Sequence, residues 1–239
     1  MVYRDFWYQV HLTLGQYPPL YYAVFARRYP FSHMRVTPNT QVCIEGFPRS
    51  ANSYAVVAFK LANPQVPIAH HLHVPGQILE AVRQNIPTVL VIRHPRECVA
   101  SFMVFQRSER PAPYLKAYIR FHQAVLPVVE QVVVADFHQV VTNINGVIAA
   151  LNARFDTRFQ FVADLPGQQE RIFARLEEIN RQFFKGDQLK SMRPDEHRKQ
   201  LKIALQHRIE AHRLFPEAEA WYEKMRQYCF QPVPENARD

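Results

Sequence analysis

The sequence is poor in glycine and cysteine and contains no long apolar run. It has 6 glycines and 18 prolines in 239 residues, so its turns must rely mainly on proline, asparagine and aspartate. The cysteines, Cys43, Cys98 and Cys229, are odd in number and far apart, which argues against a disulfide framework and for a reducing compartment. No stretch has the apolar length of a membrane span or the layout of a signal peptide. We therefore expect a cytoplasmic protein without stable membrane insertion.

Acidic residues are fewer than basic ones. The 21 aspartates and glutamates face 29 lysines and arginines, giving a net charge of +8. This balance favours an anionic partner: a nucleic acid, an acidic membrane surface, or a phosphorylated or sulfated small molecule. Because the sequence has no zinc-finger spacing, aromatic RNA-binding motif or basic run, we expect no nucleic-acid partner. Charge alone does not choose between the other two classes, and nothing indicates the oligomeric state.

Short apolar runs alternate with helical patterns along the chain. Strands are predicted at 41–46, 88–92 and 131–135, with a further short segment at 66–73. Helices are predicted at 53–61, from Pro75, from Pro95 and from Tyr114 to about Val129. Asn52 or Ser53 is expected to cap the first of these helices. The pattern predicts one α/β domain over 1–239 with three layers, a mainly parallel central sheet, a P-loop-like strand–loop–helix and a helical C-terminal third.

The loop after the first predicted strand has the character of an anion site. Backbone N–H groups and the start of the next helix attract an anion there, and Arg49 adds a fork of donors suited to phosphate or sulfate. Ser50, Asn52 and Ser53 add neutral donors. A nucleoside triphosphatase has Gly-Lys-Ser/Thr at this position, where the present sequence has Ala51-Asn52-Ser53. Without the lysine, this loop fits a magnesium-bound β/γ-phosphate pair poorly. The alternative is a strand–turn–helix connection that binds nothing.

A second group of candidates follows the strand predicted at 88–92. Arg93 stands at the end of that strand and Ser101 lies on the following helix. In a parallel sheet they should reach the same edge as Arg49, and one arginine with one hydroxyl commonly holds a phosphate. The alternative pairs Arg93 with Asp136 or another carboxylate. Two anion sites at one edge suit a nucleotide with two separated phosphates.

Together these segments resemble a known family. PRSANSY (48–54) is similar to the loop that holds the 5′-phosphosulfate in sulfotransferases that use 3′-phosphoadenosine 5′-phosphosulfate (PAPS). RHPRECVAS (93–101) resembles the element of that family that holds the 3′-phosphate, and the likeness extends in order over about 41–152. The resemblance implies PAPS as cofactor, with no metal required. The cofactor contacts that it implies are Arg49, Ser50, Ala51, Asn52, Ser53, Tyr54, Arg93 and Ser101.

The sequence departs from the family pattern at several positions. Ala51 replaces the usual glycine, so the loop must tolerate a Cβ there. His94 replaces an aspartate, and Ala135 with Asp136 replaces the usual Tyr-Glu-Asp start. The family's C-terminal Arg-Lys-Gly stretch, which also touches the 3′-phosphate, has no clear match. The candidates to replace it are Lys190, Arg193, Arg198 and Lys199.

Three histidines lie in the segment 69–75, where the family has Lys-Thr-His-Leu-Pro. This match places His73 at the position of the catalytic base and His71 at that of the lysine. On an extended segment these two side chains face the same way, and His70 points away. The predicted catalytic residues are His73 as the base, His71 as the alternative base or as a donor to the transferred group, and Arg49. A zinc or iron site is the competing interpretation, but no nearby carboxylate or cysteine completes a ligand set.

The resemblance implies in-line transfer of a sulfuryl group from PAPS to a hydroxyl or amine, leaving 3′-phosphoadenosine 5′-phosphate (PAP). Positioning and electrostatics should dominate such a reaction, by analogy with phosphoryl transfer. The expected acceptor is a small molecule or a saccharide, with a glycolipid head group included. Two alternatives stay open: a catalytically inactive nucleotide-binding module of the same fold, and a P-loop kinase, which the absent Gly-Lys-Ser/Thr ending disfavours.

Overall fold

A computed structural model describes residues 10–11, 14–15, 17–24 and 33–231. Within them, four parallel strands form one sheet in the order β2-β1-β3-β4. The strands are β1 (Val42–Gly46), β2 (Ile68–His70), β3 (Thr88–Ile92) and β4 (Val133–Asp136). The expected α/β class with a parallel sheet is confirmed.

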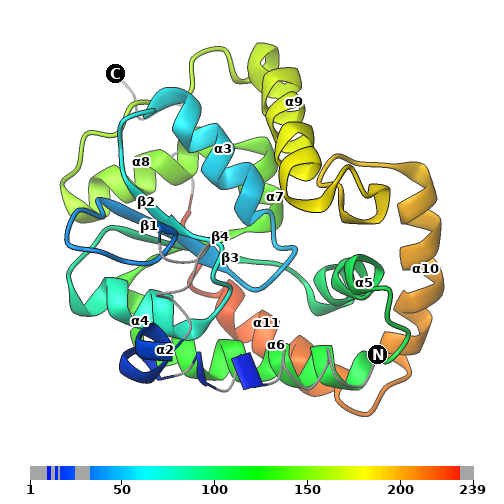
Figure 1. Cartoon of the computed structure of the whole chain (residues 1–239). Coiled ribbons are helices and arrows are strands. Elements are labelled where there is room, and N and C mark those ends of the chain that lie inside the picture. The colour runs from blue at the N-terminus through cyan, green and yellow to red at the C-terminus, as the bar shows by residue number, and fades with distance from the viewer. Residues whose placement is uncertain (1–9, 12–13, 16, 25–32, 232–239) are drawn as a thin grey trace.

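Helices cover both faces of this sheet (Figure 1). One face carries α3 (Asn52–Ala62), α7 (Phe137–Thr142), α8 (Ile144–Phe155) and α9 (Leu165–Phe184). The other carries α4 (Pro75–Arg83), α5 (Pro95–Gln106), α6 (Pro111–Val125) and α11 (Phe215–Arg226). The short α2 (Pro18–Val24) packs on α4, and α10 (Glu196–Glu210) packs on α5.

The strand β3 shows why the sheet must be covered on both sides. All five of its residues are buried, and side chains alternate between the two faces of a strand. Leu90 and Ile92 pack with the helices α5 and α6, whereas Val89 and Val91 pack with α3 and α8. Burial on both faces explains the uninterrupted apolar, mostly β-branched sequence of this strand.

Prolines set several helix boundaries. Helices begin at Pro75 and Pro95 as predicted, since proline at the first helical position loses no hydrogen bond. The helix predicted from Tyr114 begins earlier, at Pro111, and changes at Leu126 into a 3₁₀ helix, η2 (Leu126–Gln131). Pro127 explains the change, because it lacks the N–H that an α-helix needs there.

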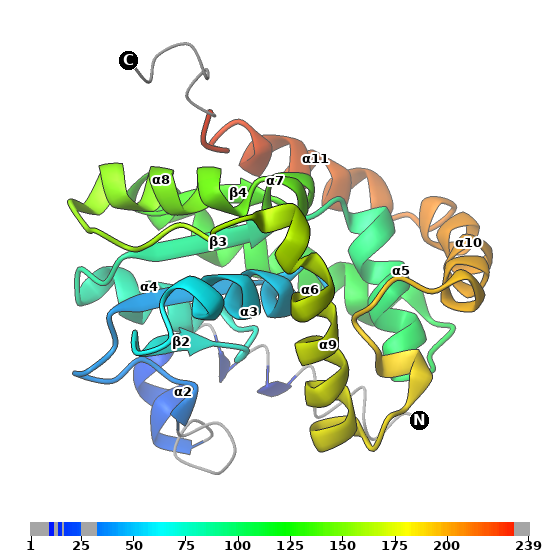
Figure 2. The ribbon, with the colours of Figure 1, turned by 90° about the horizontal axis from the view of Figure 1, so that it is seen from above.

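The carboxyl ends of β1, β2 and β3 lie at one edge of the sheet, facing α5, α9 and α10 (Figure 2). The chain leaves β1 toward β2 on one side, and it leaves β3 toward β4 on the other. Ligands of open parallel sheets bind where such connections diverge. The expected place for a site is therefore just beyond the carboxyl ends of the neighbouring strands β1 and β3. Within the described residues, no helix combines the length and apolar character needed to cross a membrane.

Candidate functional site

The loop between β1 and α3 is tightly folded. The side-chain amide of Asn52 donates to the carbonyls of Gly46 (3.2 Å) and Phe47 (3.0 Å), closing the loop on itself. A Cβ on Gly46 would lie 2.2 Å from the carbonyl oxygen of Val91, so only glycine fits beside the neighbouring strand. The helix cap predicted at Asn52 or Ser53 is wrong. Ala51 occupies the N-cap position without a side-chain bond, because the Asn52 amide closes the loop and Ser53 bonds a histidine.

Four non-glycine residues of the candidate site have left-handed backbones. Their φ angles are 68° at Arg49, 76° at Ala51, 60° at His71 and 54° at His73. Such conformations cost about 1–3 kcal/mol each and are typical of functional sites, where the surrounding fold holds them in place. The extended backbone predicted for the histidine segment is therefore wrong beyond His70, where β2 ends.

We predict that Ala51→Gly stabilises the protein. A left-handed alanine costs roughly 1–2 kcal/mol, and glycine removes this cost. About half of the benefit is cancelled, because glycine loses more chain entropy on folding than alanine does. The expected increase in the free energy of unfolding is about 0.5–1 kcal/mol, measured by chemical denaturation. Gly46→Ala is the matched control of opposite sign and should lose about 1–3 kcal/mol, because its Cβ meets backbone. A loss of stability in Ala51→Gly would contradict the strain argument.

Arg49 is a half-buried cation without a carboxylate partner in the described part of the chain. Its guanidinium donates to the Ser101 hydroxyl (3.0 Å) and to the Ser191 carbonyl (2.9 Å), which uses two of five N–H donors. Burial, and then the charges of Arg198 and Arg93, lower the pKa of Arg49 to about 10. Such a group is poised to bind an anion.

Arg93 and Ser101 reach Arg49, as the parallel sheet predicted. Arg93 donates to the carbonyl oxygen of Arg49 (2.9 Å) and its guanidinium lies over the Phe137 ring, 3.8 Å from the centroid. It also faces a carboxylate, that of Glu97, at 3.7 Å. The predicted anion-binding residues of the two loops thus lie together.

Helix α10 adds two more cations to this cluster. Arg198 is 7 % exposed and donates to the carbonyls of Gln188 and Arg193. Burial lowers the pKa of Lys202, and the charges of Arg93, Arg49 and Arg198 lower it further, with Glu97 opposing. Hereafter, Arg49, Arg93, Arg198 and Lys202 are called the cationic cluster. Lys202 was missed by the sequence reasoning, although it follows Arg198 by four residues and so shares its helix face.

The other C-terminal candidates are engaged elsewhere. Arg193 forms an ion pair with Glu170 (2.9 Å), and Lys199 pairs with Glu196 (3.4 Å) on the exposed side of α10. Lys190 lies over the Phe105 ring, 5.4 Å from its centroid. Of the four candidates, Arg198 is the one that joins the cationic cluster.

Two departures from the family pattern have structural roles. His94 caps α5 by accepting from the backbone N–H of Arg96 at 3.3 Å, which is the role an aspartate commonly fills. Asp136 caps α7 and accepts the Tyr222 hydroxyl at 2.9 Å. The alternative that pairs Arg93 with a carboxylate is met by Glu97 at 3.7 Å and not by Asp136.

The remaining predicted loop residues are buried. Ser50 is fully buried, and its hydroxyl has no hydrogen-bond partner among the described residues. Tyr54 is 7 % exposed and packs against the Phe173 ring at 6.3 Å. Tyr54 thus anchors α3 against α9, and Ser50 is an unsatisfied polar group directly beside Arg49.

His73 is held by Glu45, a residue that the sequence reasoning passed over. Its Nδ1 lies 3.2 Å from the Glu45 carboxylate and 3.0 Å from the Gly46 carbonyl oxygen. Burial lowers the pKa of His73, but its hydrogen bond to Glu45 and the charge of Glu45 outweigh burial and raise the pKa above 6.5. The imidazole is 26 % exposed, and Nε2 has no protein partner among the described residues. This geometry leaves Nε2 as the atom that can take a proton.

His71 and His70 form a separate pair. His71 Nε2 lies 2.7 Å from the Ser53 hydroxyl, and its Nδ1 lies 2.5 Å from Nδ1 of His70. The expectation that His70 points away is therefore wrong, because the left-handed turn at His71 brings the rings together. Both nitrogens of His71 are engaged, which favours His73 over His71 as the base. No group of three potential metal ligands occurs in the described ranges.

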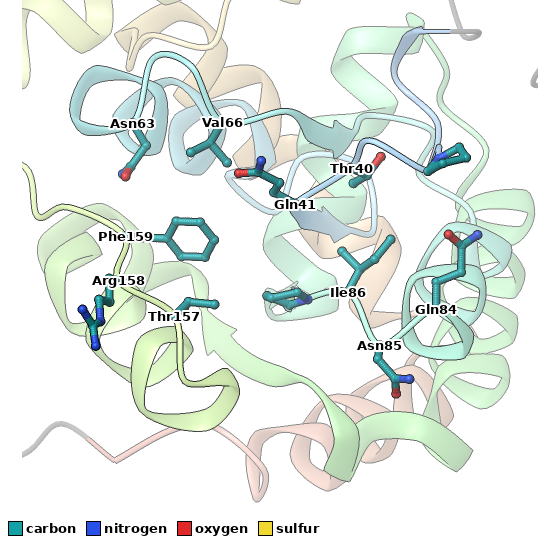
Figure 3. A pocket seen from close by; sticks show the side chains of 12 residues that line it. Thr40, Gln41, Asn63, Val66, Gln84, Asn85, Ile86, Thr157, Arg158 and Phe159 are labelled. Atoms are coloured by element: carbon teal, nitrogen blue, oxygen red, sulfur yellow. The ribbon is translucent and has the colours of Figure 1, made fainter.

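A cavity of about 630 Å³ lies at the opposite edge of the sheet, where the strands begin. Figure 3 shows Gln41, Asn63 and Phe159 around it, with no carboxylate in its lining. It contains none of the predicted site residues, and we assign it no function. No family model, curated protein or solved structure matches this chain.

Proposed function

We propose that this protein is a sulfotransferase that uses PAPS and a histidine base. The observation that carries the proposal is Arg49, a half-buried cation with cationic neighbours and no carboxylate partner in the described ranges. Its charge also acts on His73, where it is the smallest of the influences on the pKa and opposes protonation of the imidazole. An anion-binding group therefore lies beside a proton acceptor, which is the pairing that sulfuryl transfer requires.

Each group has a defined task in this proposal. Arg49 and the first turn of α3 would hold the 5′-phosphosulfate, and Arg93, Arg198 and Lys202 would hold the 3′-phosphate. His73 Nε2 would take the proton of the acceptor hydroxyl or amine, while Glu45 orients the ring and stabilises its protonated form. The cationic cluster fits the donor because Glu97 is the one carboxylate that pairs with it among the described residues, and a ligand with two phosphates supplies further negative charge.

The proposal is tested by calorimetry with PAP, compared with adenosine 5′-monophosphate and with ATP and magnesium. PAP should bind most tightly, because only PAP carries the separated 3′- and 5′-phosphates. Lys202→Met should weaken PAP binding about tenfold, the loss of one charge-assisted contact of about 1.4 kcal/mol. Adenosine 5′-monophosphate should bind Lys202→Met and the wild type alike.

Lys199→Met is the matched control, since it makes the same change three residues earlier on α10 at an exposed ion pair. It should leave PAP affinity unchanged. Equal binding of PAP and ATP, or no binding of either, would sink the assignment. Binding of PAP without sulfation of any hydroxyl, amine or saccharide acceptor would favour the inactive nucleotide-binding module.

A further inference from the structure

Ser53, His71 and His70 form a continuous chain of hydrogen-bonding groups. The Ser53 hydroxyl at the start of α3 lies 2.7 Å from His71 Nε2, and the two Nδ1 atoms of His71 and His70 are 2.5 Å apart. One proton must lie between the two Nδ1 atoms, because two bare nitrogens would repel each other. The chain therefore has two arrangements, which differ in the direction of every proton.

Both histidines are held in their neutral forms. Burial lowers the pKa of His70 to about 4 despite the nearby Glu45, and it lowers the pKa of His71 well below 6.5, with His70 and His73 adding to the effect. A chain of neutral imidazoles moves a proton by exchanging tautomers, without forming an imidazolium. This separates the pair from His73, whose carboxylate partner favours the charged ring.

The neutral environment sets the direction in which the chain can work. If Ser53 gave its proton to His71, an imidazolium would form on one of two half-buried rings, which the loss of solvent around them opposes. In the opposite direction the Ser53 proton moves to a ligand. Each ring then gives up one proton and receives another from the next group in the chain, so neither ring becomes charged. The chain is therefore suited to donating a proton and is poorly suited to activating Ser53 as a nucleophile.

We propose that His70, His71 and Ser53 are a neutral proton relay that protonates the leaving oxygen of the sulfuryl donor. The inference rests on the proposed function. When the S–O bond to the 5′-phosphate breaks, its electron pair stays on the bridging oxygen, which takes the Ser53 proton. His71 Nε2–H reprotonates Ser53, His70 Nδ1–H reprotonates His71, and a solvent proton enters His70 at Nε2. The acceptor's own proton goes separately to His73.

The relay predicts which ring nitrogens carry protons in the complex with PAPS before transfer, formed without an acceptor. Nitrogen NMR of protein labelled in its histidine rings should show His71 protonated at Nε2 and His70 at Nδ1, both neutral near neutral pH. His70→Asn keeps a polar group near the Nδ1 position but cannot exchange tautomers, and Ser53→Ala removes the terminal donor. His71 protonated at Nδ1 in this PAPS complex would overturn the relay, because Ser53 would then donate to His71 and not to the ligand.

Conversion of PAPS to PAP, with water or an added phenol as the acceptor, provides the functional measurement. Ser53→Ala should lower the rate about 10²-fold, at the low end of proton-transfer contributions. His70→Asn should lower it about tenfold, because it removes the resupply of the proton and leaves the terminal donor in place. PAP affinity should change less than threefold in His70→Asn, since His71 lies between His70 and Ser53. Unchanged turnover in His70→Asn would refute the relay and leave the sulfotransferase proposal intact. Failure of the wild type to bind PAP would overturn both.

Discussion

Arg49→Met is expected to weaken PAP binding about 100-fold and, at the same time, to leave the ligand-free protein slightly more stable. Arg49 offers two or more charge-assisted hydrogen bonds to the proposed phosphosulfate, each contributing about 1.5–3 kcal/mol. Losing them corresponds to about 3 kcal/mol, or two orders of magnitude in affinity. Methionine loses the guanidinium that lies over the Phe105 ring, 5.4 Å from its centroid, but its unbranched thioether can contact the same ring.

The gain in stability follows from the environment of the charge. A pKa lowered from its ordinary value to about 10 corresponds to about 3 kcal/mol of unfavourable burial and repulsion at neutral pH. Two hydrogen bonds, to Ser101 and Ser191, offset about 2 kcal/mol of this. The net expectation for Arg49→Met is a gain of about 1 kcal/mol in the free energy of unfolding, measured by chemical denaturation.

Arg193→Met is the control for both measurements. Arg193 forms an exposed ion pair with Glu170, and removing such a pair changes stability by less than about 1 kcal/mol. PAP affinity should stay at the wild-type value. The contrary result would be that Arg49→Met destabilises the protein by more than about 2 kcal/mol and binds PAP normally. Arg49 would then be a structural residue, and the main observation behind the proposed function would be lost.

The sequence was sufficient to predict the sheet edge but not the partners of its residues. Parallel strands with polar loops at their carboxyl ends placed Arg49 and Arg93 together, and they are joined by a hydrogen bond of 2.9 Å. The strand β3 was predicted at its exact bounds because all five residues are buried and the four that follow Thr88 are apolar. These features depend on local pattern, which a sequence displays directly.

The missed features depend on long-range packing or on backbone strain. Lys202 joins the cationic cluster only because α10 packs on α5, about 100 residues away in the sequence. The left-handed backbones at His71 and His73 contradict the extended segment that alternation suggested, because a pattern of residue types does not reveal a strained turn. Glu45 could have been found, since a carboxylate inside an apolar buried strand must have partners.

Glu45→Gln is expected to lower the free energy of unfolding by about 3 kcal/mol and to lower the pKa of His73. Four groups converge on the fully buried carboxylate: the backbone N–H of Gly46 (3.1 Å) and Leu72 (2.9 Å), the Gln77 amide (3.2 Å) and His73 Nδ1 (3.2 Å). All four can donate, so the NH₂ of glutamine would face donors without an acceptor. Breaking a buried, hydrogen-bonded charge pair costs about 3–5 kcal/mol.

The pH dependence of this loss separates the charge of His73 from the other three bonds. Because the folded pKa of His73 is raised above 6.5, its charged form adds stability that is complete below pH 6.5 and vanishes as the pH rises through the folded pKa. The difference between wild type and Glu45→Gln should therefore be larger at about pH 5.5 than at about pH 8.5. Glu109→Gln, at an exposed pair with Arg208, should stay within about 0.5 kcal/mol of wild type at both.

The same variant should change catalysis in a way that a merely structural residue would not. Without the carboxylate, only the hydrogen bond to the Gly46 carbonyl still raises the pKa of His73 against burial, so the acidic limb of the rate profile for PAPS turnover should move to lower pH. The plateau rate should fall as well, because a weaker base takes the acceptor proton less readily. A fall in rate with an unmoved profile would mean that Glu45 only supports the fold and that a group other than His73 takes the proton.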